Sequence, residues 1–265
     1  MFRSTDGGST WAVRRSPTLL GGFQQSGAMI YALAVDPTNA SILYINSGDV
    51  DFGGISKSTD GGATWTPRAA VSPRGGAFFA NEIIVDPLAP STLYAIGLKV
   101  YKSTDSGASW RGAEGLPEWL TGLALDRSAP GTLYAETLDG LYTSRDRGDS
   151  WTLVPYAPAL NVFVVDPVRR GQLFGGRTSV GRDGFLAVID PVALTIRAST
   201  YLGGRNDDAI ADLAVTRDGS VMLTGVTGSP DFPVAGNATI YHQRSDAFLS
   251  VLAPNTDAAP RPRDR

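Results

Sequence analysis

Apolar residues in this chain form short runs, which turn-forming pairs such as Asp-Pro, Asp-Gly and Gly-Gly separate. Four runs are apolar almost throughout, which is typical of strands covered on both faces. These runs are residues 29–35, 81–85, 120–125 and 161–165. No segment sustains the i, i+3, i+4, i+7 apolar spacing of an amphipathic helix. The pattern therefore predicts an all-β chain with very little helix.

Each of these runs is followed by an aspartate that opens a short turn before a second strand. The aspartates are Asp36, Asp86, Asp126 and Asp166, spaced 50, 40 and 40 residues apart. The second strands contain Leu followed by an aromatic residue, and they cover 42–46, 92–96, 132–136 and 172–176. A repeat of 40–50 residues made of short strands is typical of four-stranded propeller blades rather than of helical repeats.

A second motif, S-x-D-x-G-x-x-W, occurs four times and holds four of the five tryptophans in the chain. Its members are Ser4, Asp6, Gly8 and Trp11; Ser58, Asp60, Gly62 and Trp65; Ser103, Asp105, Gly107 and Trp110; and Ser144, Asp146, Gly148 and Trp151. Short strands at 100–103 and 141–144 precede the third and fourth copies. We therefore expect the motif to form the hairpin between the third and fourth strands of each blade.

The residue types of this motif suit a turn. An aspartate readily accepts hydrogen bonds from backbone N–H groups two or more residues further on. Glycine two positions later supplies a positive φ angle, and the tryptophan offers a large apolar face for packing on the sheet. Because every copy has the same neighbours, we interpret these residues as structural. The exposed aspartates could also bind a cation or a glycan.

The motif resembles the Asp-box, or BNR, repeat of sialidase- and sortilin-like β-propellers, and the resemblance covers residues 1 to about 155. It implies that the motif is a structural turn on propeller blades, away from the central axis where such proteins hold their sites. Residues 183–254, with STYLGG and a later DFP, resemble the SBBP (β-propeller) repeat of bacterial surface and secreted proteins. Thr216 stands where that repeat usually has Asp.

These patterns predict a β-propeller over residues 1–253, with Asp-box blades in 1–155 and SBBP-like blades in 156–253. We expect strands three and four of a first blade at 2–14, complete blades near 29–68, 81–112, 119–155 and 160–203, and three strands of a last blade at 209–253. The chain would then hold five to six blades of a seven-bladed or larger ring. Residues 254–265 are rich in Pro, Ala and Arg, and we expect a disordered tail or linker there.

Composition excludes several function classes. The 265 residues carry a net charge of -3. The chain therefore lacks the excess of basic residues expected of a nucleic-acid-binding protein. The absence of Cys rules out disulfides and thiolate metal sites, and a single His, His242, rules out multi-histidine centres. No run approaches 18 consecutive apolar residues, so we predict no membrane span. The chain begins directly on a motif copy without a signal peptide pattern, and we expect it to be a fragment of a longer propeller.

Several residues are candidates for chemistry. Asp49 and Asp51, and Asn206 with Asp207 and Asp208, could supply oxygen ligands for Ca²⁺, although we expect them to be solvated loop residues. We expect His242 to lie in a loop of the last blade and not to be a ligand. Trp119 is the one tryptophan outside the motif. It could form an exposed aromatic platform, but we expect it to pack at the start of a strand.

Two function classes follow. We expect a non-catalytic, monomeric interaction scaffold of a secreted or cell-surface bacterial protein that needs no cofactor and binds a protein or polysaccharide partner. The alternative is a glycoside hydrolase of the Asp-box propeller type, such as the xyloglucanases, with paired carboxylates on loops. A sialidase is disfavoured because the signature Arg-Ile-Pro is missing. A site built from non-repeated residues such as Glu82, Arg205 or Asp208 would favour the hydrolase.

Overall fold

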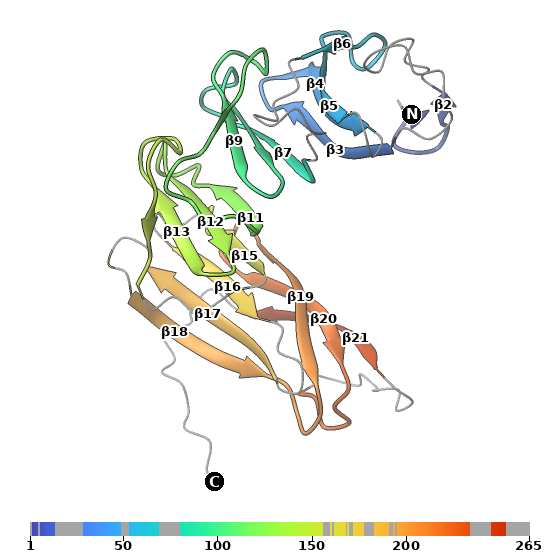
Figure 1. Ribbon diagram of the computed structural model, residues 1–265. Helices are drawn as coiled ribbons and strands as arrows, with labels where there is room; N and C mark the ends of the chain where they lie inside the picture. Colours follow the sequence, from blue (N-terminus) through green and yellow to red (C-terminus); the bar gives the residue numbers. More distant parts are fainter. Residues whose placement is uncertain are drawn as a thin grey trace. The chain divides into compact units, whose positions relative to one another are not determined.

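The chain is seen in a computed structural model that describes residues 2–4, 6–13, 29–48, 53–68, 80–155, 160, 162–167, 169, 172–177, 183–190, 193, 195–233 and 245–252. This part of the chain consists of strands and turns, without a helix (Figure 1). Within these residues there is accordingly no helix with the length and apolarity that crossing a bilayer requires.

Four sheets have four strands each, and neighbours in the sheet are also neighbours in the sequence. The first two consist of β3 (Met29–Asp36), β4 (Asn39–Gly48), β5 (Gly53–Ser58) and β6 (Thr66–Pro67), and of β7 (Glu82–Val85), β8 (Leu93–Ile96), β9 (Val100–Ser103) and β10 (Arg111–Gly112). The other two consist of β11 (Leu120–Leu125), β12 (Leu133–Thr137), β13 (Gly140–Ser144) and β14 (Thr152–Leu153), and of β15 (Val162–Val165), β16 (Leu173–Arg177), β17 (Gly184–Asp190) and β18 (Thr195–Leu202).

Two further sheets are smaller. A hairpin of β1 (Phe2–Arg3) and β2 (Ala12–Val13) precedes the four large sheets, and a three-stranded sheet of β19 (Asp208–Val215), β20 (Val221–Thr227) and β21 (Asp246–Leu252) follows them. All pairs are antiparallel. The prediction of four-stranded antiparallel blades, with partial blades before and after them, is confirmed.

The second strand of each large sheet supplies the most deeply buried aromatic residue. The second strand has a neighbouring strand on each side. An aromatic ring on it is therefore shielded at both edges and both faces. These residues are Tyr44, Tyr94, Tyr134 and Phe174, which are at most 2% exposed. The Leu-aromatic pair of the sequence repeat therefore marks the centre of each blade.

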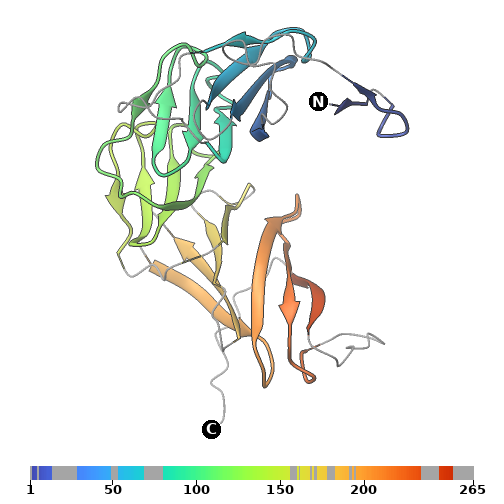
Figure 2. The same ribbon diagram turned by 45° about the vertical axis from the view of Figure 1, so that its right-hand side comes forward.

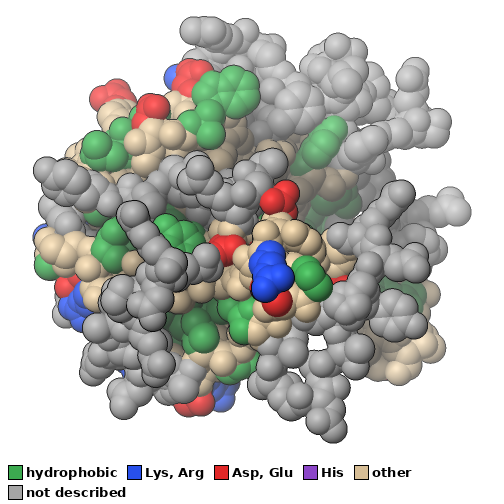
Figure 3. Space-filling view, turned by 90° about the horizontal axis from the view of Figure 1, so that it is seen from below, with side chains coloured by type: hydrophobic (Ala, Val, Ile, Leu, Met, Phe, Trp, Pro, Cys, Tyr) green, Lys and Arg blue, Asp and Glu red, His purple; other side chains and the backbone are tan. Residues whose placement is uncertain are grey.

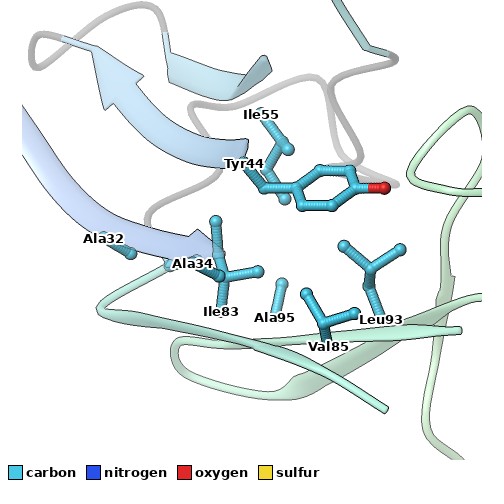
Figure 4. Packing of buried hydrophobic residues seen from close by; sticks show 9 residues of the cluster. Ala32, Ala34, Tyr44, Ile55, Ile83, Val85, Leu93 and Ala95 are labelled. Atoms are coloured by element: carbon cyan, nitrogen blue, oxygen red, sulfur yellow. The ribbon is translucent and has the colours of Figure 1, made fainter. Parts of the chain in front are cut away.

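The chain divides into two compact units, residues 1–119 and 120–265. In the first unit, Figure 4 shows Tyr44 and Ile55 facing Ile83, Val85 and Leu93 across the space between two sheets, with small alanines beside them. This packing joins the β3–β6 sheet to the β7–β10 sheet, since β3 lies along β7. Burying an aliphatic side chain of this size contributes about 1.5–3 kcal/mol.

In the second unit, β15 lies along β11, and β19 packs on the β15–β18 sheet (Figures 1 and 2). Phe174 and Leu186 from that sheet share a core with Ile210, Leu213 and other apolar residues of the last sheet. Each unit is thus a stack of sheets that cover one another's apolar faces, which explains why the first strands of the repeat are apolar almost throughout.

The meander divides the connections of each sheet between two ends. Because consecutive strands are antiparallel, the connections between strands one and two and between strands three and four lie at one end, which we call the box end. The connections between strands two and three, and the linkers from one sheet to the next, lie at the other end, which we call the linker end. In the β7–β10 sheet the linker end consists of residues 97–99 and 113–119.

Candidate functional site

Each copy of the S-x-D-x-G-x-x-W motif forms a closed turn in a hairpin. The first copy joins β1 to β2, and the other three join the third and fourth strands of a large sheet. In the third copy, Ser103 Oγ donates to Asp105 Oδ1 at 2.8 Å, and the Gly107 N–H donates to Ser103 Oγ at 2.9 Å. The Ser109 N–H and hydroxyl donate to the two carboxylate oxygens at 2.8 and 2.6 Å. Trp110 closes the turn, since its indole N–H donates to the Gly107 carbonyl at 3.1 Å.

The other three copies have the same bonds to the serine and the aspartate. The glycine of each copy has a positive φ, for example +82° at Gly107, which a side chain would disfavour. The tryptophans differ in burial. Trp65 is 8% exposed, whereas Trp11 is 63% exposed, so the same local turn is combined with quite different packing.

These bonds set the charge of the motif aspartates. Hydrogen bonds from the Ser or Thr four residues further on lower the pKa of Asp6, Asp60 and Asp105 to about 2, and they lower the pKa of Asp146 as well. Such a carboxylate has no proton to donate near neutral pH, and its oxygens are already occupied. The motif therefore forms a turn fixed by hydrogen bonds and is poorly suited to acid–base catalysis.

The aspartates of the second repeat are also turn residues. They are buried, and each accepts a backbone N–H from two or three residues further on. The four bonds are Thr38 N–H to Asp36, Leu88 N–H to Asp86, Ser128 N–H to Asp126 and Arg169 N–H to Asp166. All eight repeated aspartates of the two motifs therefore lie at the box end of their sheets.

The linker end has non-repeated polar residues instead. Asn46 of β4 donates its side-chain N–H to the carbonyl of Ala80 at 3.0 Å, and the N–H of Leu160 donates to Glu136 Oε1 of β12 at 3.0 Å. In both cases a central strand holds the linker to the next sheet. Burial raises the pKa of Glu136 to about 7, because the carboxyl is 1% exposed.

A polar cluster surrounds the linker between β18 and β19. Asp208 is 1% exposed, and its Oδ2 accepts the Gly204 N–H at 2.8 Å and the Ser229 hydroxyl at 2.7 Å. A Cβ on Gly203 would stand 2.5 Å from Asp208 Oδ2 and 2.7 Å from Asp183 Oδ1, so two carboxylates approach this backbone closely. The expectation that Asp208 is a solvated loop residue is wrong.

The neighbouring residues complete this cluster. The Arg205 N–H donates to Asp231, the Asn206 N–H donates to Ser229 Oγ, and the Gly228 N–H donates to the Asp207 carbonyl. The cluster therefore joins the end of STYLGG and the residues after it to Gly228, Ser229 and the aspartate of DFP. These two stretches carry the SBBP resemblance. Within the described residues, no group of three or more His, Asp or Glu is placed to hold a metal ion.

The remaining candidates have different outcomes. Trp119 is 61% exposed, so the expectation that it packs at the start of a strand is wrong. Glu82 begins β7 at the linker end and is exposed. Asp49, Asp51, His242 and the tail from 254 lie outside the described residues. On the face shown in Figure 3, charged and hydrophobic side chains of the described residues are interspersed, and no extended patch of one charge is visible among them.

Comparison with known proteins identifies relatives for this arrangement. A xyloglucanase of Acetivibrio thermocellus is 28% identical over 200 residues, which are 62% of this chain and 23% of that protein. A xyloglucanase of Paenibacillus is 30% identical over 178 residues, 58% of this chain and 17% of that protein. This chain is similar to xyloglucanases. It spans less than a quarter of the length of these curated relatives, and no family model matches it.

Solved structures agree on the fold. An ancestral GH74 enzyme superposes with a TM-score of 0.61 and 13% identity over 94% of this chain and 35% of that one. The GH74 xyloglucanase of Xanthomonas campestris gives 0.59 and 17%, over 85% of this chain and 37% of that one. The structure of YCF48 bound to D1 peptide gives 0.60 and 20%, over 86% and 69%. The fold is that of β-propeller blades.

These relatives correct the functional interpretation of the sequence. The expectation of a non-catalytic scaffold is wrong, because the curated relatives are enzymes that bear the name xyloglucanase. The error has a physical cause. Repetition indicates that an aspartate has a structural role in the blade. It says nothing about the role of the non-repeated acids at the linker end. The alternative of a glycoside hydrolase of the Asp-box type agrees better with the relatives.

Proposed function

We propose that this chain is part of a glycoside hydrolase that acts on xyloglucan or a closely related β-glucan. The observation that carries the proposal is the similarity to several xyloglucanases over 58–62% of the chain. The β-propeller fold is consistent with it, since the solved relatives include GH74 enzymes. A polysaccharide substrate of this size is encountered outside the cell, so we propose an extracellular or cell-surface setting.

The linker end is the better place for the chemistry. Hydrolysis of a glycosidic bond uses two carboxyl groups, one of which must donate a proton to the leaving oxygen. The motif aspartates are unsuited to that task because hydrogen bonds lower their pKa, to about 2 for Asp60 and Asp105, and occupy their oxygens. The linker end offers acids outside the repeats, among them Asp139 and Asp183. In the sequence, Asp49 and Asp51 are two further acids outside the repeats, between the residues of β4 and β5.

The test is hydrolysis of xyloglucan by the whole protein that carries this chain, followed as release of reducing ends. We expect Asp51→Asn, Asp49→Asn or Asp183→Asn to lower kcat by about 10²–10⁴, the usual contribution of a catalytic acid or base. Asp105→Asn is the matched control. It removes a motif carboxylate at the box end and should leave kcat unchanged at temperatures where the protein stays folded.

Two results would overturn the proposal. One is a folded wild-type protein that releases no reducing ends from xyloglucan or from unsubstituted β-1,4-glucan. The other is a loss of kcat in folded Asp105→Asn as large as in the non-motif variants, which would place the chemistry at the box end.

A further inference from the structure

Trp119 is an exposed aromatic residue at the linker end of the β7–β10 sheet. It is 61% exposed, and Leu98, in the connection between β8 and β9, is 59% exposed. The two residues are joined by their backbones, because the Trp119 N–H donates to the Leu98 carbonyl at 2.9 Å. A large indole beside an exposed leucine is an apolar surface that the fold holds out to solvent.

Two other linkers have buried residues at the corresponding contacts. Ala80 and Leu160 hold the linkers before β7 and β15 through hydrogen bonds to Asn46 and Glu136, and both are at most 4% exposed. Trp119 also holds its linker, the one before β11, through a hydrogen bond from its backbone N–H to Leu98, but the residue is 61% exposed. Burial of an indole stabilises a fold, and an exposed Trp119 does not make that contribution.

The backbone at Trp119 is strained. Its φ angle is +68°, a left-handed conformation that is unfavourable for a bulky side chain and that glycine adopts easily. The neighbouring contacts maintain it. Lys99 Nζ and Glu118 Oε1 form an ion pair at 2.9 Å, which ties the linker to the connection that contains Leu98. Strain of this kind persists where the surroundings impose it, and it is concentrated at binding and catalytic sites.

The indole is also unlike those of the Asp-box motif. The Trp110 N–H donates to the Gly107 carbonyl and so takes part in its own turn. Among the described residues, the Trp119 indole N–H has no acceptor. Its ring face and its donor are therefore both available to a ligand.

We propose that Trp119 is a stacking platform for a sugar ring of a β-glucan, flanked by Lys99 and Glu118. This inference rests on the proposed function and names a binding position for the same substrate class. The face of an indole is electronegative, and the C–H face of a pyranose ring packs well against it. The Lys99 ammonium and the Glu118 carboxylate, which pair at 2.9 Å on residues adjacent in the chain to Leu98 and Trp119, can donate to and accept from sugar hydroxyls. An apolar platform with a few polar groups is typical of small-ligand sites.

The experiment measures binding of soluble xyloglucan and cellohexaose separately from hydrolysis, by calorimetry at a temperature where turnover is negligible. We expect Trp119→Ala to weaken binding at least tenfold and Trp119→Phe to keep affinity within about threefold. Trp11→Ala is the matched control, because Trp11 is 63% exposed but belongs to the box end. It should bind as the wild type does. A linear α-glucan of equal length serves as the ligand control, and its binding should not depend on Trp119.

The outcomes separate this inference from the proposed function. Affinity that depends on Trp119 in a protein without hydrolytic activity would support the platform and refute the hydrolase. Hydrolysis by the wild type, with equal glucan affinity in Trp119→Ala, would refute the platform alone. Absence of glucan binding by the folded wild type would refute the platform as well. Far-ultraviolet circular dichroism and urea unfolding of Trp119→Ala establish that a loss of binding is not a loss of fold.

Discussion

Glu136 allows a sharp test of how a buried carboxyl affects the stability of this protein. Its side chain is 1% exposed, and its Oε1 accepts the N–H of Leu160. Burial raises the folded-state pKa from 4.5 to about 7. The folded protein therefore keeps a proton that the unfolded chain loses as the pH rises above 4.5. The stabilising contribution is present below pH 4.5 and is lost as the pH rises to 7.

The expected magnitude follows from this difference. A pKa change from 4.5 to about 7 corresponds to about 3 kcal/mol of unfolding free energy at pH 8. Glu136→Gln removes the charge and keeps an oxygen that can accept the Leu160 N–H. We expect the variant to match the wild type at pH 4.5 and to be more stable by up to about 3 kcal/mol at pH 8. Asn46, which holds the corresponding linker in the first unit, shows that an amide suits this kind of position.

Urea unfolding followed by tryptophan fluorescence at pH 4.5, 6 and 8 measures this difference. Two variants provide controls. Glu114→Gln changes an exposed glutamate and should show no pH-dependent difference from the wild type. Asn46→Asp introduces a carboxyl at a fully buried position and should destabilise increasingly as the pH rises. A Glu136→Gln difference that stays constant from pH 4.5 to 8 would refute the reasoning, because it would mean that this carboxyl is not held protonated by burial.

Three further predictions concern the blades. Trp65→Ala should cost about 3–5 kcal/mol in urea unfolding and Trp11→Ala less than about 1 kcal/mol, since the first ring is 8% and the second 63% exposed; equal losses would contradict this. Asp105→Ala should lower the melting temperature at pH 7 and have little effect at pH 2. The pKa of Asp105 is lowered from 3.8 to about 2, so its carboxylate stabilises the fold above pH 3.8, and this contribution is lost as the pH falls to about 2. An effect independent of pH would count against this prediction. Gly203→Ala should destabilise by about 1–3 kcal/mol because its Cβ would meet two carboxylate oxygens within 2.7 Å, whereas Gly112→Ala, with no atom within 4 Å, should be neutral.

The sequence was informative wherever structure is local. Apolar runs and turn residues placed the first and second strands of the four large sheets, and the third strands of two of them, to within a few residues, because strand burial and turn geometry leave their mark on adjacent residues. The S-x-D-x-G-x-x-W motif was equally clear in the sequence, since its hydrogen bonds join residues no more than four positions apart. Repetition made both signals stronger, and it also drew attention to aspartates whose role is to hold turns.

The candidate site depends on contacts that no local pattern records. Asn46 meets Ala80 from 34 positions away, and Glu136 meets Leu160 from 24 positions away. Whether a given acid is buried and protonated, or exposed and charged, depends on which linker returns across the end of its strand. The exposure of Trp119 has the same origin, because the linker's bond to Leu98 and the ion pair beside it set the direction of the chain. The sequence by itself thus determined the blades and their turns. Only the tertiary structure decided which non-repeated side chains at the linker end are buried and which face solvent, because that outcome depends on packing between segments far apart in the chain.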